Sequence, residues 1–420
     1  MKSEKKTFYH NTIMQYLLLL AQYVFPLLTL PYLTRVLEAD LYGIITFLTA
    51  IISYFQILID FGYNLSATKD IAERQTDKQY IGIVLGRTIQ GRLYLLILSF
   101  AIYVIFIHSL PLTKENLLIS YLYFGIVVFS VFMPDFLFRG LERTGILTVR
   151  YVVSQLLTTA LTFLLIQTKE DIIWIPILRI LGLLLAFIMT WYYIKKKLHI
   201  SIYFSGVHKV LKSMKVSAIY FISTFATTAF GITNTFLFGI MNLPSSQIAY
   251  WGVSYTLISA IQSLYSPITS SLYPHMAARR DFQLIKRILI SLVPINVIAI
   301  LILFQFSKPI IVIVSGLDYI DAVPIFRSLL PVLALSFPAM LIGFPFLGIV
   351  GRIVELTAST MISAAFHILG LFFLIAIEEF NVLNVAILRS LTELMLLGSR
   401  IYLAIKFRNK IQKAVSGDDY

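Results

Sequence analysis

Long apolar runs separated by short polar stretches recur along the whole chain. An α-helix needs about 20 mostly apolar residues to cross the hydrocarbon core of a bilayer, and hydropathy on that scale predicts roughly twelve spanning helices here. They cover residues 10–33, 41–60, 83–107, 117–138, 147–167, 172–194, 215–240, 247–272, 287–307, 326–350, 354–377 and 382–405. The pattern therefore predicts an all-α integral membrane protein.

The two halves of the chain resemble each other at matching positions. Three pairs are each 210 residues apart: Arg179 and Arg389, Tyr192 and Tyr402, Lys196 and Lys406. The fourth and tenth predicted spans also share a Pro-x5-Gly motif, at residues 134–140 and 345–351. Chance similarity between apolar strings is the alternative. A true repeat with an even number of spans gives two parallel six-helix lobes, related by a pseudo-two-fold axis along the membrane normal.

The longest basic link divides the predicted spans six and six. It reads KKKLHISIYFSGVHKVLKSMK at residues 195–215. The expected organisation is an N-terminal lobe at 1–196, a cytoplasmic linker at 197–214 and a C-terminal lobe at 215–420. The first apolar run continues past the length of a signal peptide and has no small-residue cleavage site, so we expect the first span to remain in the mature protein.

Composition agrees with a membrane protein, because 58% of the residues are hydrophobic and only 13% are charged, against about a quarter charged in soluble domains. The net charge of +13 is explained by the way Lys and Arg residues are distributed between the two sides of the membrane. With the N-terminus placed in the cytoplasm, 25 of the 34 Lys and Arg residues fall in inner segments and five in outer loops. This distribution obeys the positive-inside rule with both termini cytoplasmic, so the charge does not indicate a nucleic-acid partner.

Ionisable residues inside the predicted spans are the candidate functional groups, because such residues are costly in lipid and usually mark a substrate path. Arg179 and Arg389 could bind a phosphate-type anion in a wet cleft, with Arg92 near its inner entrance. Each has a structural alternative. Arg389 could pair with Glu393 four residues on, whereas Arg179 and Arg92 could extend to the membrane surface.

Three acids inside spans are candidates for ion coupling. Asp60, Asp135 and Glu393 could bind a coupling H⁺ or Na⁺, or could pair with neighbouring arginines. His367 could relay protons or pack as a hydrogen-bonded histidine. The Gly82-x3-Gly86 motif indicates a close-packing seam rather than a phosphate loop. Because the chain has no Cys and no Asp-x-Asp, His-Glu-x-x-His or glycine-rich nucleotide motif, we expect no enzyme activity, no catalytic residues, no metal site and no cofactor.

The segment LPYLTRVLEADLYGIITFLTAIISYFQILIDFGYNLSATKDIA, at residues 30–72, resembles the polysaccharide-repeat flippases. These are the O-antigen or capsule, Wzx-type branch of the MOP exporter superfamily. PDFLFRGLER also resembles a family motif, although Phe136 replaces a Trp and Arg139 replaces a Gln. The matching residues in the first segment are Pro31, Arg35, Leu37, Tyr42, Gly43, Asp60, Phe61, Gly62 and Ala67.

The resemblance implies a MOP-like fold of about twelve helices in two six-helix lobes. It implies transport of an undecaprenyl-pyrophosphate-linked oligosaccharide, an O-antigen or capsule repeat unit, from the cytoplasmic to the outer leaflet by alternating access. Arg179, Arg389 and Arg92 would bind the pyrophosphate. The expected location is the bacterial inner membrane. Membrane lipids, a polysaccharide polymerase and chain-length proteins are the expected partners in lipopolysaccharide biosynthesis. The alternative is a multidrug or organic-cation antiporter of the same superfamily, which would depend on Asp60 or Asp135.

Overall fold

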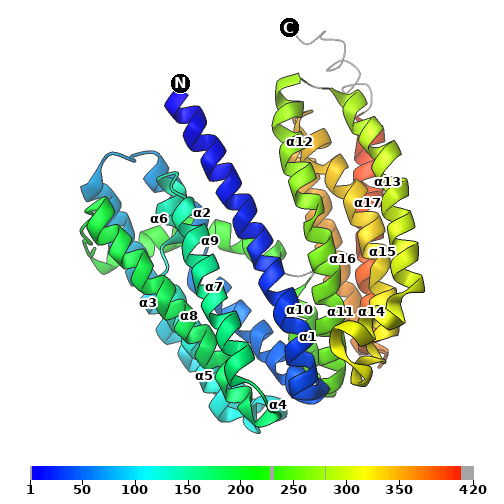
Figure 1. Cartoon of the computed structure of the whole chain (residues 1–420). Coiled ribbons are helices and arrows are strands. Elements are labelled where there is room, and N and C mark those ends of the chain that lie inside the picture. Colours follow the sequence, from blue (N-terminus) through cyan, green and yellow to red (C-terminus); the bar gives the residue numbers. More distant parts are fainter. Residues whose placement is uncertain (1, 228–230, 280, 408–420) are drawn as a thin grey trace. The chain divides into compact units, whose positions relative to one another are not determined.

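The computed structural model describes residues 2–227, 231–279 and 281–407, and these are almost entirely helical with no β-strand among them (Figure 1). The helices of the first half are α1 (Lys2–Asp60), α2 (Tyr63–Ala72), α3 (Lys78–Ser109), α4 (Pro111–Lys114), α5 (Leu117–Val131), α6 (Asp135–Gly140), α7 (Gly145–Leu165), η1 (Lys169–Ile173), α8 (Trp174–Tyr193), η2 (Ile194–Leu198) and α9 (Val207–Thr227). Those of the second half are α10 (Ile232–Ile240), α11 (Ser245–Ser263), α12 (Tyr265–Arg279), α13 (Phe282–Gln305), α14 (Ser307–Ser315), η4 (Leu317–Tyr319), α15 (Ala322–Ile342), η5 (Gly343–Gly348), α16 (Ile353–Ala376) and α17 (Val382–Lys406). The predicted all-α class is confirmed.

Nine helical stretches among the described residues are long and apolar enough to cross a membrane, so the protein is a multi-pass membrane protein. The first stretch, Asn11–Ala72, contains two of the predicted spans. A straight helix of the 59 residues of α1 would be about 88 Å long, roughly three times the hydrocarbon thickness. The backbone of α1 breaks at Glu38, where φ is 58° and ψ is 177°, and this break separates the spans predicted at 10–33 and 41–60.

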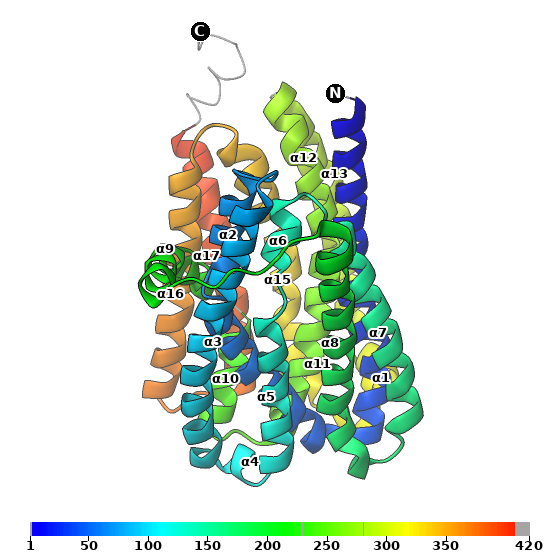
Figure 2. The same ribbon diagram turned by 90° about the vertical axis from the view of Figure 1, so that its left-hand side faces the viewer.

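The span predicted at 215–240 does not form as one helix. Its residues are divided between α9, which begins at Val207, and the nine-residue α10. Figure 1 shows α9 crossing the direction of its neighbours, and Figure 2 shows it nearly end-on. Three lysines in the first half of α9 lower its hydropathy, and side-chain packing against α1, α2 and α3 holds it across them. The span predicted at 247–272 is likewise divided between α11 and α12. Neither is among the nine stretches, because α11 is not apolar enough and α12, with 15 residues, is too short.

The chain forms two compact units. Unit 1 contains Met1–Thr228 and Thr235–Ser245, and unit 2 contains Ala229–Asn234 and Ser246–Tyr420. The predicted division at residue 215 therefore differs from the packing, since α9 and most of α10 associate with the first half. Ser66 and Ser217 share a hydrogen bond of 2.7 Å between their hydroxyl oxygens. On α10, the Phe236 ring lies 4.8 Å from that of Tyr54.

The predicted linker, residues 197–214, packs on unit 1 along the glycine seam of α3. A Cβ atom at Gly82 or Gly86 would overlap backbone atoms of residues 201–203. The amide of Tyr203 donates to the carbonyl oxygen of Gly82 at 3.2 Å. The Gln90 amide group donates to the Ser205 carbonyl at 3.0 Å and accepts from its N–H at 2.7 Å. The two glycines thus form a close-packing seam, and its partner is the linker rather than a second helix.

Candidate functional site

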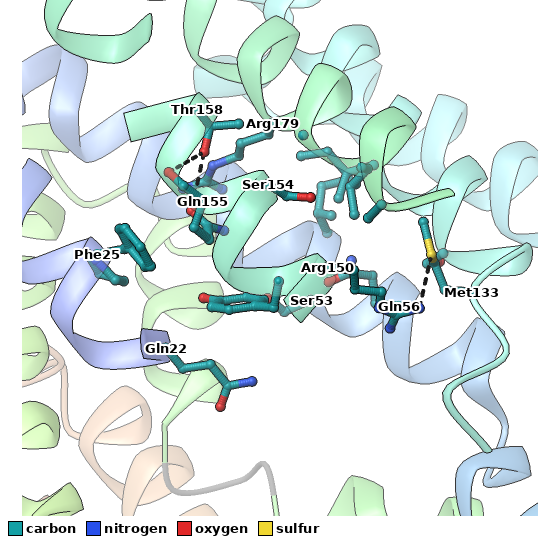
Figure 3. A pocket seen from close by; sticks show the side chains of 18 of the residues that line it. Gln22, Phe25, Ser53, Gln56, Met133, Arg150, Ser154, Gln155, Thr158 and Arg179 are labelled. Atoms are coloured by element: carbon teal, nitrogen blue, oxygen red, sulfur yellow. Dashed lines mark hydrogen bonds between the residues drawn. The ribbon is translucent and has the colours of Figure 1, made fainter. Parts of the chain in front are cut away.

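A cavity of about 620 Å³ lies inside unit 1, lined by residues of α1, α2, α3, α5, α6, α7 and α8 and by Met133 between α5 and α6. Figure 3 shows side chains of α1, α7 and α8, together with Met133, around it. Six charged residues line the cavity: Asp60, Arg92, Asp135, Arg139, Arg150 and Arg179. Four arginines face two aspartates, so the charged lining has an excess of two positive charges. Two of the three predicted anion-binding residues, Arg92 and Arg179, therefore line one cavity.

Arg92 is neutralised by an acid. Its Nη2 donates to Oδ1 of Asp60 at 2.7 Å, and its Nη1 donates to the Met133 carbonyl at 2.9 Å. The Arg92 side chain is only 3% exposed, and its guanidinium lies over the Phe136 ring at 5.3 Å. A buried guanidinium requires such a partner, because an unpaired charge in a dry interior is costly. Both residues of this pair line the cavity.

Arg150 forms the second neutral pair of the cavity. It donates from Nη2 to Oδ1 of Asp135, the second candidate coupling acid. It also donates from Nη1 to the Thr190 hydroxyl at 3.0 Å, and the same nitrogen lies 3.7 Å from the sulfur of Met133 (Figure 3). Sequence reasoning did not select Arg150, since it lies near the start of a predicted span where a basic residue only indicates topology.

Arg179 differs from these two arginines. It is exposed, it lines the cavity, and its Nη1 donates to the neutral hydroxyl of Thr49 at 3.0 Å. Its guanidinium carbon lies 5.6 Å from the centre of the Tyr123 ring. Neither Arg179 nor the exposed Arg139 forms an ion pair within the part of the chain that the structure describes. These two guanidiniums account for the two excess positive charges of the cavity lining, and they could bind an anionic group of a ligand.

Hydroxyl and amide side chains cover much of the remaining cavity wall. On α7 they recur at helical spacing, which places them on one face, and Figure 3 shows Ser154, Gln155 and Thr158 in this arrangement. The polar neutral residues of the lining are Gln22, Thr29, Thr49, Ser53, Gln56, Asn64, Ser130, Tyr151, Ser154, Gln155, Thr158, Thr159 and Thr162. Sequence analysis missed the α7 stripe. Its signal was present, as Ser154, Thr158 and Thr162 are each four residues apart.

The other two predicted site residues, Arg389 and Glu393, lie in unit 2 and do not line this cavity. Arg389 Nη2 donates to Glu393 Oε1 at 2.8 Å, and the two side chains are 7% and 6% exposed. Each of the three candidate coupling acids thus contacts an arginine. Among the described residues, no group of three or more His, Cys, Asp or Glu side chains is arranged to hold a metal ion.

Comparisons with known proteins agree with this architecture. The family described as "Polysaccharide biosynthesis protein" matches residues 8–280. A protein of Escherichia coli (strain K12), described as a candidate O-antigen transporter, is 25% identical over 290 residues, which are 69% of this chain and 70% of the relative.

Solved structures of similar fold include two transporter classes. One, titled lipid II flippase MurJ in an inward closed conformation, superposes with a TM-score of 0.67 at 17% identity and covers 94% of this chain and 89% of its own. Another is an inward-facing multidrug resistance MATE family transporter of the MOP superfamily. It gives a TM-score of 0.65 at 14% identity and covers 94% and 99% of the two chains. At these identities the likeness establishes the fold.

Proposed function

The chain belongs to the polysaccharide biosynthesis protein family, and we propose that it is a flippase for a lipid-linked oligosaccharide. The resemblance of residues 30–72 to Wzx-type flippases of the MOP superfamily is confirmed by this match and by the O-antigen transporter relative. The proposed substrate is an undecaprenyl-pyrophosphate-linked O-antigen or capsule repeat unit. It would move from the cytoplasmic to the outer leaflet of the bacterial inner membrane, with the two units exposing the cavity to each side in turn.

The observation that carries this proposal is the charge of the unit 1 cavity. A pyrophosphate diester has two negative charges, and the cavity has an excess of two positive charges. Guanidinium groups suit phosphate because their planar N–H groups can form two parallel hydrogen bonds to its oxygens. Arg179 would provide the main contact and Arg139 a second one, while Arg92 would remain committed to Asp60. Arg389 as a pyrophosphate ligand stays a prediction.

The neutral polar wall supports the rest of the substrate assignment. Sugars present many hydroxyl groups, and the Ser, Thr and Gln side chains of α1 and α7 can both donate and accept hydrogen bonds. The apolar polyprenyl tail would stay in the lipid, where burying it needs no protein pocket. Transport requires no bond to be made or broken. A polysaccharide polymerase and chain-length proteins are the proposed partners.

Replacing Arg179 tests the proposal. We expect Arg179→Gln to lower transport of lipid-linked oligosaccharide by roughly 10- to 100-fold, because a hydrogen bond to a charged group contributes about 1.5–3 kcal/mol. The measurement is surface polysaccharide in a flippase-null strain that expresses the variant, normalised to its amount in the membrane. Arg179→Lys should retain part of the activity, since it keeps the charge.

Arg143→Gln is the matched control, because Arg143 is exposed and does not line the cavity. It should complement as well as the unsubstituted chain. Full complementation by Arg179→Gln would refute the role of this guanidinium. Failure of the unsubstituted chain to complement any flippase-null strain tested, at normal membrane levels, would refute the flippase itself.

The antiporter alternative predicts a different cavity. An exporter of organic cations should offer unpaired acids, but Asp60 and Asp135 are both bound to arginines. We therefore expect no increase in ethidium efflux from cells that express the chain. Efflux that is lost in Asp60→Asn and unchanged in Arg179→Gln would favour the antiporter.

A further inference from the structure

A surface of unit 1 outside the cavity combines lysines with exposed apolar side chains. It is formed by the end of η2, the linker and α9, residues 195–222, and we call it the linker surface. Its six lysines are all exposed: Lys195, Lys196, Lys197, Lys209, Lys212 and Lys215. No Asp or Glu occurs between residues 195 and 227. The linker surface therefore has six positive charges and no acid of its own.

Acids on or beside the neighbouring helices have other partners. α9 packs against α1, α2 and α3. Asp70 of α2 contacts Arg87 of α3 at 2.9 Å, and Glu73, which follows α2, lies 4.0 Å from Lys69. The acid at the end of α1, Asp60, is bound to an arginine. None of the six lysines forms an ion pair within the part of the chain that the structure describes, so their charges are available to a ligand.

The linker surface also exposes large apolar side chains. Phe204 is 69% exposed and Ile219 is 73% exposed. The other exposed apolar residues of this segment are Ile202, Tyr203, Val207, Leu211, Val216 and Ile222. A surface that faces water rarely exposes so many large apolar groups together. Lysines beside exposed apolar and aromatic side chains are typical of a helix that lies in the interface between water and lipid.

The two kinds of side chain share the outward face of α9. The members of this face recur three or four residues apart: Lys209, Lys212, Lys215, Ile219 and Ile222. Val210 and Ser217, on the opposite face, are fully buried. The outward face therefore begins basic and continues apolar along the helix.

The depth at which α9 begins follows from its position along α3. Just before α9, Ser205 forms two hydrogen bonds with the Gln90 side chain of α3. From Gln90 to its end at Ser109, α3 is about 28 Å long. The hydrocarbon core of a bilayer is about 30 Å thick. With the Ser109 end of α3 at one boundary of the hydrocarbon, α9 begins close to the other boundary.

The later part of α9 lies at the same depth. Its Phe221 ring stacks on that of Phe61, with 4.9 Å between the ring centres. Phe61 directly follows α1, which is about 33 Å long from its break at Glu38 to its end at Asp60. Figures 1 and 2 show α9 crossing the direction of its neighbours in unit 1. It therefore lies along the boundary where lipid phosphate groups meet the hydrocarbon.

We propose that the linker surface is a docking surface for anionic phospholipids. Its apolar side chains contact the acyl chains, and its lysines extend to the headgroups and donate hydrogen bonds to phosphate oxygens. A soluble phosphate has no apolar part to cover Phe204 and Ile219. A zwitterionic headgroup has no net charge, so six unpaired lysines favour a lipid whose headgroup is negative. The surface lies outside the cavity, so this inference does not depend on the proposed function.

A fluorescence measurement tests which lipid covers α9. The chain has no Cys, so in the full-length Ile219→Cys variant a bimane label has only one thiol to react with. The labelled chain is placed in mixed bilayers of phosphatidylglycerol and phosphatidylcholine in which one of the two has brominated acyl chains, which quench a label that they touch. We expect phosphatidylglycerol to bind beside the label at least threefold more strongly than phosphatidylcholine.

Two results of this measurement would overturn the proposal. One is equal binding of the two lipids. The other is absence of quenching by either brominated lipid, which would show that water or a protein covers the label. A label at Leu301→Cys, on the exposed side of α13, is the reference for lipid contact without selectivity, and it should be quenched equally by both lipids.

Charge variants separate the lysines from the rest of the surface. In the labelled Ile219→Cys chain, three further changes should bring the ratio of the two binding constants close to one: Lys209→Gln, Lys212→Gln and Lys215→Gln. The matched control removes three charges from α2, α3 and the turn between them: Lys69→Gln, Arg74→Gln and Lys78→Gln. Acids lie among these three residues, and the control should keep the ratio of the unsubstituted surface.

Equal changes in both triple variants would show that the total charge of the chain attracts the lipid, and would overturn the assignment to the linker surface. A lysine variant that keeps the threefold preference would overturn it as well. Quenching by the brominated lipids shows that each variant is inserted in the bilayer. None of these measurements needs the oligosaccharide, so failure of the lipid surface and failure of the flippase in complementation can be told apart.

Discussion

Arg92 and Arg179 are both arginines in predicted spans, yet their surroundings differ. Arg92 is buried and bonded to Asp60, whereas Arg179 is exposed in the cavity and bonded to a hydroxyl. In the first arrangement the Asp60 carboxylate neutralises the Arg92 guanidinium, so this guanidinium is not available to bind a ligand. The second retains a guanidinium for a ligand. The structural alternative for Arg389 is supported in the same way, since it contacts Glu393.

Breaking one buried pair should be costly. In Asp60→Ala the Arg92 guanidinium loses its acid but stays buried, and we expect the free energy of unfolding to fall by about 3–5 kcal/mol. The double variant Asp60→Asn with Arg92→Gln removes both charges and should recover much of that loss. Thermal unfolding in detergent, followed by tryptophan fluorescence, measures both. A double variant less stable than the single one would contradict this account.

At the scale of elements, a helix is interrupted at a corresponding place in each half of the chain. The Pro-x5-Gly motif at 134–140 covers the break between α5 and α6, and the motif at 345–351 covers η5 and the turn before α16. Each interruption comes two long helices before the end of its half. The likeness of the motifs therefore has a structural counterpart within each unit, which supports the proposed repeat.

The crossing of α9 over α2 depends on one glycine. Gly62 has φ of 77°, and a Cβ there would lie 2.5 Å from the Ser217 carbonyl oxygen and 2.6 Å from the Phe221 amide nitrogen. We expect Gly62→Ala to lower the free energy of unfolding by much more than the roughly 1–2 kcal/mol that a left-handed conformation costs a residue with a side chain. The fall in melting temperature measures this loss. Gly351→Ala is the matched control, because its φ is 76° with no atom nearby. Equal destabilisation by both changes would show that the contact with α9 has little effect.

For the whole molecule, the apolar surface and the charge pattern describe a membrane protein. Many apolar residues of α13 are exposed, among them Ile290, Ile295 and Leu301, as expected for a helix that contacts lipid. Several basic residues in the charge count, namely Arg280, Arg408, Lys410 and Lys413, lie outside the described residues. The cytoplasmic placement of both termini stays a prediction.

Reporter fusions test that placement. If the positive-inside rule sets the topology, alkaline phosphatase fused after Lys114 should be active outside the cytoplasm, and the same enzyme fused after Lys197 should be inactive. Green fluorescent protein fused to the C-terminus should fluoresce. The opposite pattern at both internal sites would invert the predicted orientation and with it the direction of transport.

The sequence alone determined the helical class, the extent of most spans and the family resemblance. The reason is that a helix can cross a bilayer only if its backbone hydrogen bonds are satisfied within the helix. Each spanning helix also needs about 20 apolar residues. These are local requirements, so they can be seen in single stretches of the chain. The sequence also selected Arg92 and Arg179, because charge in an apolar run is conspicuous.

Only the tertiary structure decided which charges are neutral, because neutralisation depends on distance in space. Arg92 and Asp60, for example, are 32 residues apart. The division of the segment 215–240 between α9 and α10, and the linker that fills the seam of Gly82, likewise follow from packing between distant parts of the chain. Side chains that meet across helices determine the site, and hydropathy along a single helix carries no information about them.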